Sequence, residues 1–235
     1  GIFRNMTETH YRMYVNHFFT ACDLQDFLTE ILLVFKDLVS RPVFPSDWFH
    51  MTMHQNTVIL ESLRHFARII REHFTEPFEK QVWSNFFHCS IAFLIQPALQ
   101  LDLFPSNKKA MILTRYCDLR RETTTEICNM WYNLGEHKPN FIMHMVGPLL
   151  EMSMLNENEL RRLTIPIFFD MMQCEFFSSK HLTEGYGDTK RNTSHIRGHF
   201  HDFEKEMIEK IDILVEGGKG DYEYKDLFFE IMSEL

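Results

Sequence analysis

Residues 23–40 read DLQDFLTEILLVFKDLVS, and this stretch decides the fold. Its apolar residues recur every three or four positions, which is the spacing of one face of an α-helix over four turns. They are Leu24, Phe27, Leu28, Ile31, Leu32, Phe35, Leu38 and Val39. Asp23 is the expected N-cap, and Pro42 follows the expected end. The pattern predicts a helix that packs by one face and carries no chemistry of its own.

The same periodicity continues along the chain and predicts about nine helices. Their expected ranges are 7–21, 24–40, 57–74, 78–95, 107–134, 140–154, 157–177, 199–215 and 222–235. No stretch alternates with period two, so we expect essentially no sheet. The long helices come in pairs about 40 to 50 residues apart, which predicts an all-α, armadillo/HEAT-like helical-repeat solenoid. A compact multi-helix bundle is the alternative.

Several positions predict breaks and connections. Gly135 is expected to cap the helix that ends at Leu134, although the polar run 120–126 predicts a bend or an exposed face within that helix. Gly147-Pro148 is expected to interrupt one helix, and Pro166 to kink the next. Residues 178–198 are rich in Gly, Ser, Thr and charge, so they predict a polar surface loop.

Composition predicts one helical-repeat domain over residues 1–235. The hydrophobic fraction is 45%, with 23 Phe and only 9 Gly, which favours helices joined by short connections. A net charge of -9 disfavours nucleic-acid and anionic-lipid partners, which need basic surfaces. Five widely spaced cysteines without a CxxC motif predict reduced cytosolic thiols. No apolar run approaches the roughly 18 residues of a membrane span, so no direct membrane insertion is expected.

No residue pattern predicts a metal, a cofactor or a catalytic group. His50 and His54 are four residues apart but lack the Glu of an HExxH motif, and His195, His199 and His201 cluster around a loop end. His201-Asp202 matches the dipeptide of helical metal-dependent (HD-type) phosphohydrolases. That chemistry also needs an upstream His and a downstream Asp at the metal. We therefore expect surface or capping histidines.

Two further motifs predict structure and not catalysis. Gly217-Gly218-Lys219-Gly220 follows a predicted helix, whereas a phosphate-binding loop follows a strand, so a helix cap and turn is expected. Cys89, next to His88, lies in the middle of an apolar helix and is expected to be buried. The sequence has no GxSxG motif.

Two apolar features predict packing or binding. Trp83 is expected to anchor the core between neighbouring helices. A cluster of Phe and Met side chains is expected to lie in the core or, as the alternative, to form a groove for a partner helix. The cluster consists of Phe168, Phe169, Met171, Met172, Phe176 and Phe177.

Four segments resemble one family, the Rac-directed DOCK guanine-nucleotide exchange factors. They are residues 6–48, 133–150 (NLGEHKPNFIMHMVGPLL), 165–176 (IPIFFDMMQCEF) and 214–228 (LVEGGKGDYEYKDLF). The resemblance covers nearly the whole chain and corresponds to the helical segment that precedes the catalytic region of that family.

The resemblance implies a non-catalytic scaffold that positions a lipid-binding module and a catalytic module. It implies an ELMO-type adaptor and a Rac-type GTPase as partners of the parent protein. The implied location is the cytoplasm, with recruitment to the plasma membrane through other modules. No exchange motif of the family matches this chain, so the resemblance transfers no catalytic residue. A free-standing helical-repeat adaptor that binds a peptide, and the HD-type phosphohydrolase, are the alternatives.

Overall fold

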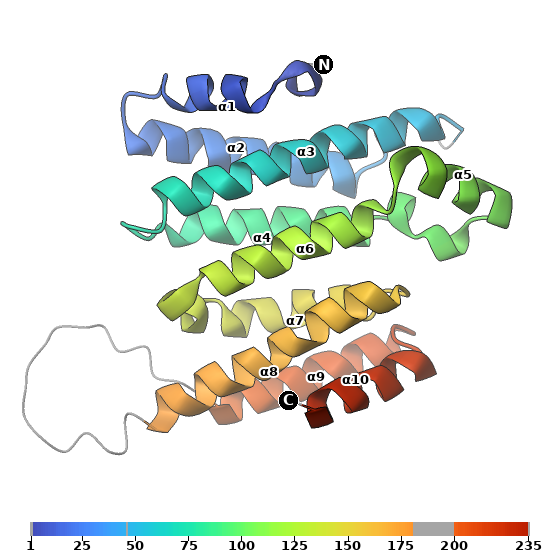
Figure 1. The fold of residues 1–235 in the computed structure, drawn as a ribbon. Helices are drawn as coiled ribbons and strands as arrows, with labels where there is room; N and C mark the ends of the chain where they lie inside the picture. The colour runs from blue at the N-terminus through green and yellow to red at the C-terminus, as the bar shows by residue number, and fades with distance from the viewer. Residues whose placement is uncertain (1, 46, 181–199, 235) are drawn as a thin grey trace, which may run out of the picture. The chain divides into compact units, whose positions relative to one another are not determined.

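The structure is helical throughout the residues that it describes. A computed structural model describes residues 2–45, 47–180 and 200–234, and every regular element in these ranges is a helix (Figure 1). The α-helices are α1 (Glu8–Val15), α2 (Ala21–Ser40), α3 (Phe49–His73), α4 (Lys80–Ile95), α5 (Ser106–Tyr116), α6 (Leu119–Asn133), α7 (Ile142–Ser153), α8 (Asn158–Lys180), α9 (Phe200–Glu216) and α10 (Tyr222–Glu234). Short 3-10 helices are η1 (Phe3–Asn5), η2 (Pro97–Leu99), η3 (Leu101–Leu103) and η4 (Gly135–Asn140).

The chain forms two compact units, Gly1–Asn133 and Leu134–Leu235. Within the first unit α2 packs on α4, and α3 packs on α6 (Figure 1). Within the second unit α7 packs on α9, and α8 packs on α10. Three of these contacts join a helix to the next helix but one, and the contact between α3 and α6 also passes over the short helix α5. Such contacts are typical of stacked helix pairs in repeat proteins. The predicted fold class, an all-α helical-repeat solenoid, is confirmed, whereas a single domain over residues 1–235 stays a prediction.

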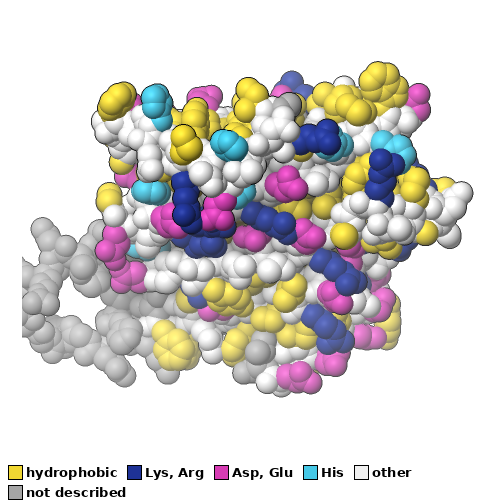
Figure 2. Space-filling model, turned by 45° about the horizontal axis from the view of Figure 1, so that its top comes forward, with side chains coloured by type: hydrophobic (Ala, Val, Ile, Leu, Met, Phe, Trp, Pro, Cys, Tyr) yellow, Lys and Arg dark blue, Asp and Glu magenta, His cyan; other side chains and the backbone are white. Residues whose placement is uncertain are grey.

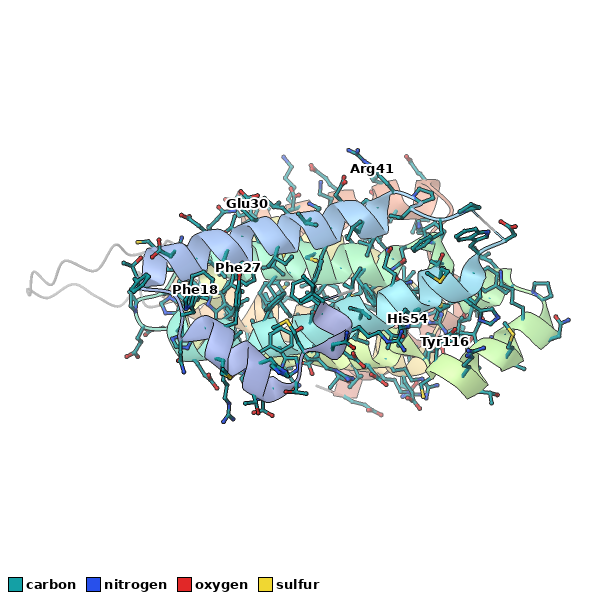
Figure 3. All side chains as sticks on the ribbon, turned by 90° about the horizontal axis from the view of Figure 1, so that it is seen from above. Phe18, Phe27, Glu30, Arg41, His54 and Tyr116 are labelled. Atoms are coloured by element: carbon teal, nitrogen blue, oxygen red, sulfur yellow. The ribbon has the colours of Figure 1, made fainter. Side chains whose placement is uncertain are left out.

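The apolar stripe of α2 is confirmed. Each of its eight predicted residues is buried or half-buried. Phe27 also contacts Phe18, which lies between α1 and α2, and the two ring centroids are 5.4 Å apart (Figure 3). Leu33 and Val34 lie outside the stripe and are exposed. The 3.6-residue period therefore correctly predicted both the helix and the face that it buries.

The predicted N-cap of α2 is wrong by one helical turn. Thr20 is the N-cap: its hydroxyl accepts a hydrogen bond from Asp23 N at 3.1 Å. The Asp23 carboxylate in turn accepts one from Thr20 N at 3.2 Å. This reciprocal capping box satisfies two backbone donors at the helix start, so α2 begins at Ala21.

The predicted long helix over 107–134 is two helices. Cys117 adopts a left-handed conformation with φ of 59°, and this residue separates α5 from α6. The polar run 120–126 is not the break, because Thr123 and Thr124 are buried. Their hydroxyls donate to the carbonyl oxygens of Leu119 and Arg120, so they satisfy their polar atoms within α6.

Other predicted boundaries also shift. The first helix ends at Val15 and not at Ala21, and α3 begins at Phe49 and not at Thr57. α7 continues through Gly147-Pro148, and α8 continues through Pro166. A proline removes only one backbone donor from its helix, and buried apolar residues on both sides of Pro148 hold α7 together.

The loop predicted at 178–198 is described only in part. α8 extends to Lys180, so the first three residues of this range are helical. The remaining residues, and His195 and His199 of the predicted histidine cluster, lie outside the described ranges.

Trp83 is a core residue of the first unit, as predicted. Its side chain is fully buried, and its indole Nε1 donates a hydrogen bond to the Phe74 carbonyl oxygen at 2.9 Å. The ring of Phe78 lies against it, with centroids 5.8 Å apart. Trp83 therefore joins α4 to the end of α3 through both apolar area and a hydrogen bond.

Replacing Trp83 by alanine is expected to lower the free energy of unfolding by about 3 to 5 kcal/mol, because it leaves a cavity and removes a large buried surface. The measurement is denaturant unfolding followed by circular dichroism. The matched control is Trp48→Ala, since Trp48 is exposed and its loss is expected to cost no more than about 0.5 kcal/mol. Equal effects of the two substitutions would contradict a core role for Trp83.

Candidate protein-interaction site

The histidines do not form a metal site in the described part of the chain. His50 Nδ1 lies 3.1 Å from the Tyr116 hydroxyl, whereas His54 is half-buried on the next turn of α3. His201 is exposed on α9, where its Nδ1 lies 3.7 Å from the Glu204 carboxylate. Over residues 2–45, 47–180 and 200–234, no three His, Cys, Asp or Glu side chains are placed to hold a metal ion. The absence of catalytic, cofactor and metal residues stays a prediction.

The five cysteines are thiols that differ in exposure, and Cys174 is half-buried. Cys89 and Cys128 are buried, and burial raises the pKa of each thiol to about 12. Such thiols stay protonated at neutral pH and are poor nucleophiles. The predicted core role of Cys89 is confirmed. Cys22 and Cys117 are exposed.

The glycine-rich segment after α9 is a helix cap, as predicted. Lys219 N donates to the Leu214 carbonyl oxygen at 2.8 Å, and Gly218 N donates to the Val215 carbonyl oxygen at 2.9 Å. Gly218 adopts the left-handed conformation, with φ of 75°, that such a cap requires. This turn leads directly into α10.

The turn and the two helices beside it enclose an apolar concavity of about 520 Å³, which we call the C-terminal groove. It is lined by Met154, Ile211, Val215, Lys219, Gly220, Asp221, Tyr222, Tyr224, Lys225, Phe228 and Phe229. All of these residues belong to the second unit. Tyr222 is 78% exposed and Phe229 is 74% exposed, which is high for large apolar side chains. The groove therefore has exposed aromatic surface on its open side.

The floor of the C-terminal groove is continuous with the core of the second unit. Met154, Tyr224 and Leu227 are buried in one apolar cluster, and Ile211 and Phe228 pack against it half-buried. A core floor fixes the shape of the groove, while the rim residues remain free to contact a ligand. Concave apolar sites with preformed walls are typical of binding sites for helices and peptides.

An ion pair between a buried arginine and a partly exposed aspartate fixes the start of α10 and thereby the groove. The Arg161 guanidinium is fully buried and donates to both carboxylate oxygens of Asp221, at 3.0 and 2.7 Å. Its Nε donates to the Leu155 carbonyl oxygen at 2.8 Å. Asp221 also accepts a hydrogen bond from Tyr224 N at 2.7 Å, so it caps the first turn of α10. The hydrogen bonds from Arg161 hold the pKa of the Asp221 carboxyl below its usual value.

A second polar contact ties α10 to α7. The Tyr224 hydroxyl and the Ser153 hydroxyl lie 2.8 Å apart in a buried position. Burial raises the pKa of Tyr224 to about 12, so this phenol is neutral and can share its proton with Ser153. The Arg161 guanidinium carbon lies 5.6 Å from the centroid of the Tyr224 ring.

The Phe and Met cluster predicted on α8 does not lie on one surface. Phe168 and Met171 are buried, and Phe168 lies against Phe228, with ring centroids 6.3 Å apart. Phe169 and Met172 are half-buried. Phe176 and Phe177 are exposed, the latter to 54%. The cluster is therefore partly core and partly surface, and the described groove lies instead between α9 and α10.

Sequence reasoning missed Tyr222 and Phe229. They are seven residues apart, so they share a helix face, and Lys225 and Asp226 stand between them. Exposed apolar side chains also occur singly on the face drawn in Figure 2, among basic and acidic ones. Exposure of an apolar side chain is thus a weak sign of a binding site. Tyr222 and Phe229 stand out only because both line the same groove.

Comparison with known proteins gives one family. The family described as the Dedicator of cytokinesis (DOCK) TPR region matches residues 1–231. The chain is 36% identical over 233 residues to Dedicator of cytokinesis protein 4 of Mus musculus, which covers 99% of this chain. It is 35% identical over 236 residues to Dedicator of cytokinesis protein 3 of Homo sapiens, which covers 100% of this chain. In both comparisons the chain spans 11% of the length of the relative.

Replacing Asp221 by alanine is expected to lower the free energy of unfolding by about 3 to 5 kcal/mol, because it leaves the Arg161 charge buried without its carboxylate. The measurement is urea unfolding at neutral pH. The matched control is Asp226→Ala, since Asp226 is an exposed aspartate of the same helix. An Asp226→Ala effect as large as that of Asp221→Ala would contradict the structural role of the pair.

The stability of wild type and that of Asp221→Ala should also depend differently on pH. The folded-state pKa of Asp221 is lowered, so its contribution to stability is fully present above the unfolded-state pKa of about 3.9. That contribution is lost as the pH falls through the lower folded-state pKa. The stability difference between wild type and Asp221→Ala should therefore be constant from pH 7 to about pH 5 and shrink below about pH 4.

Proposed function

Because the chain belongs to the Dedicator of cytokinesis (DOCK) family, we propose that it is a non-catalytic helical scaffold segment of a Rac-type guanine-nucleotide exchange factor. The observation that carries this proposal is the match of residues 1–231 to a helical-repeat region of that family. The chain corresponds to 11% of the length of its relatives, so the exchange chemistry is assigned to other modules of the parent protein.

In this proposal the segment holds a lipid-binding module and a catalytic module at fixed positions. Stacked helices would hold one another in place, because each contact buries apolar side chains of two helices. The parent protein would meet an ELMO-type adaptor and a Rac-type GTPase. It would work in the cytoplasm and reach the plasma membrane through its other modules. No helix in the described ranges is long and apolar enough to cross a bilayer.

We assign the contact with a neighbouring module to the C-terminal groove. Tyr222 and Phe229 expose apolar area that a helix of that module would cover. A free-standing adaptor would instead use the same groove for a separate peptide. In the scaffold function another module of the parent protein covers α10, whereas in the adaptor function no part of the parent protein covers it.

The segment alone is expected not to accelerate nucleotide release. Rac loaded with a fluorescent nucleotide should release it at the intrinsic rate when this chain is added, because the proposal places every exchange element outside the segment. Chelation of magnesium by EDTA serves as the positive control for release. Release several times faster than the intrinsic rate would contradict the scaffold function.

Backbone amides of α10 are expected to exchange hydrogen for deuterium more slowly in the parent protein than in the isolated chain. A docked helix would cover the C-terminal groove and stabilise α10 against local opening. Phe229→Ser should remove at least half of this extra protection, because it deletes one of the two most exposed rings of the groove. The readout is exchange followed by mass spectrometry of α10 peptides.

The matched control for that experiment is Phe177→Ser. Phe177 is an exposed phenylalanine of the same unit and belongs to the cluster on α8. It should leave the protection of α10 unchanged. Equal exchange of α10 in the parent protein and in the isolated chain would favour a free-standing adaptor. If only Phe177→Ser reduced the protection of α10, the neighbouring module would contact α8 and not the C-terminal groove.

A further inference from the structure

α5 is a helix that the first unit scarcely covers. Of the residues from Ser106 to Tyr116, Ile112 is the one that is buried. Figure 1 shows α5 beyond the ends of α4 and α6, at one end of that unit. An isolated helix of this length is only marginally stable in water, so α5 depends on the contacts that it makes with the rest of the unit.

Lys108 of α5 contacts two aromatic rings, one at the start of α3 and one just before α5. The Lys108 ammonium lies 4.2 Å from the centroid of the Phe49 ring and 4.0 Å from that of Phe104. At the other end of α5, the Tyr116 hydroxyl lies 3.1 Å from His50 Nδ1. Cation–π contacts leave the positive charge uncompensated, because the rings are neutral.

The surroundings of α5 are basic in an otherwise acidic protein. Residues 102–120 contain four Lys or Arg and two Asp, whereas the whole chain has a net charge of -9. Within α5 there is no acidic residue. Lys109 pairs with Asp102 at 2.7 Å, but neither Lys108 nor Arg115 has an acidic partner among the described residues.

Apolar side chains lie between these charges. Met111 follows Lys108 by three residues and precedes Arg115 by four, so the three side chains share one helix face. Met111 is exposed, and Leu103, just before α5, is 76% exposed. We define the α5 surface as Leu103 together with the face of α5 that carries Lys108, Met111 and Arg115; it contains both basic and apolar groups.

We propose that the α5 surface binds an acidic amphipathic segment of a partner protein. Carboxylates of such a segment would pair with Arg115 and Lys108, and its apolar side chains would cover Met111 and Leu103. The inference goes beyond the scaffold function, since it would hold even if the chain positioned no module. It also uses a surface of the first unit, whereas the C-terminal groove belongs to the second.

An acidic protein segment fits this surface better than an anionic membrane does. A membrane presents negative charge to a whole face of the protein and would repel the acidic residues outside α5, since the chain as a whole has a net charge of -9. A peptide a few turns long contacts α5 alone. Its carboxylates therefore meet the local positive charge without the repulsion from the rest of the chain.

The test uses a fluorescent helix-forming peptide of about four turns, with Glu on one face and Leu on the other. Its binding to the full 235-residue chain is measured by fluorescence anisotropy. Arg115→Glu and Met111→Ser should each weaken binding by about fivefold or more. Raising NaCl from about 50 to about 300 mM should also weaken binding, because exposed charges are screened.

Matched controls separate this surface from the others. Arg162→Glu makes the same charge reversal at an exposed arginine of α8 and should leave the affinity unchanged. Phe229→Ser should also leave it unchanged, so that failure at α5 and failure of the C-terminal groove are distinguishable. Each variant is checked for an unchanged melting temperature.

Three outcomes would overturn the proposal. The first is no binding of the acidic peptide to the wild-type chain. The second is equal weakening by Arg115→Glu and Arg162→Glu, which would reflect net charge alone. The third is binding of α5 to phosphatidylserine vesicles, lost in Arg115→Glu, without binding of the peptide; this result would make the surface a membrane contact.

Discussion

Each helix of this chain has to bury its apolar stripe against another helix, because a single helix has no interior of its own. The stripe of α2, from Leu24 to Val39, has its counterpart in α4, and that of α7 has its counterpart in α9. Consecutive helices therefore turn back, and alternate helices stack into layers. Stacking buries only the helix faces that have a neighbouring helix. A helix without such a neighbour therefore keeps apolar side chains exposed.

Two buried arginines determine where helices start. Arg120 is almost fully buried and donates to Asp118 at 3.0 and 2.9 Å, at the start of α6. Arg161 does the same to Asp221 at the start of α10. Each aspartate directly follows a residue with positive φ, Cys117 or Gly220. A buried charge is costly without its partner, so each pair fixes the direction in which the chain leaves the turn.

The surfaces that remain open follow from these two constraints. In the second unit the turn before α10 sets Tyr222 and Phe229 beside α9, and the result is an apolar groove. In the first unit the break at Cys117 separates α5 from α6, and α5 is left with one buried residue. The groove is apolar, whereas the α5 surface is basic and apolar, so the two surfaces suit ligands of different chemistry.

Local sequence determined the helices, the face of α2, the burial of Trp83 and the glycine cap at Gly218, because these depend on neighbours within a few turns of the chain. It also carried the family resemblance. Local sequence did not determine the break at Cys117, since no proline or glycine marks it. The next residue, Asp118, accepts hydrogen bonds from a buried arginine. Nor did it determine the groove. Arg161 and Asp221 are 60 residues apart, and Ser153 and Tyr224 are 71 apart. Only tertiary packing brings such residues together, and it thereby decided which apolar side chains of α8, α9 and α10 became core and which became surface.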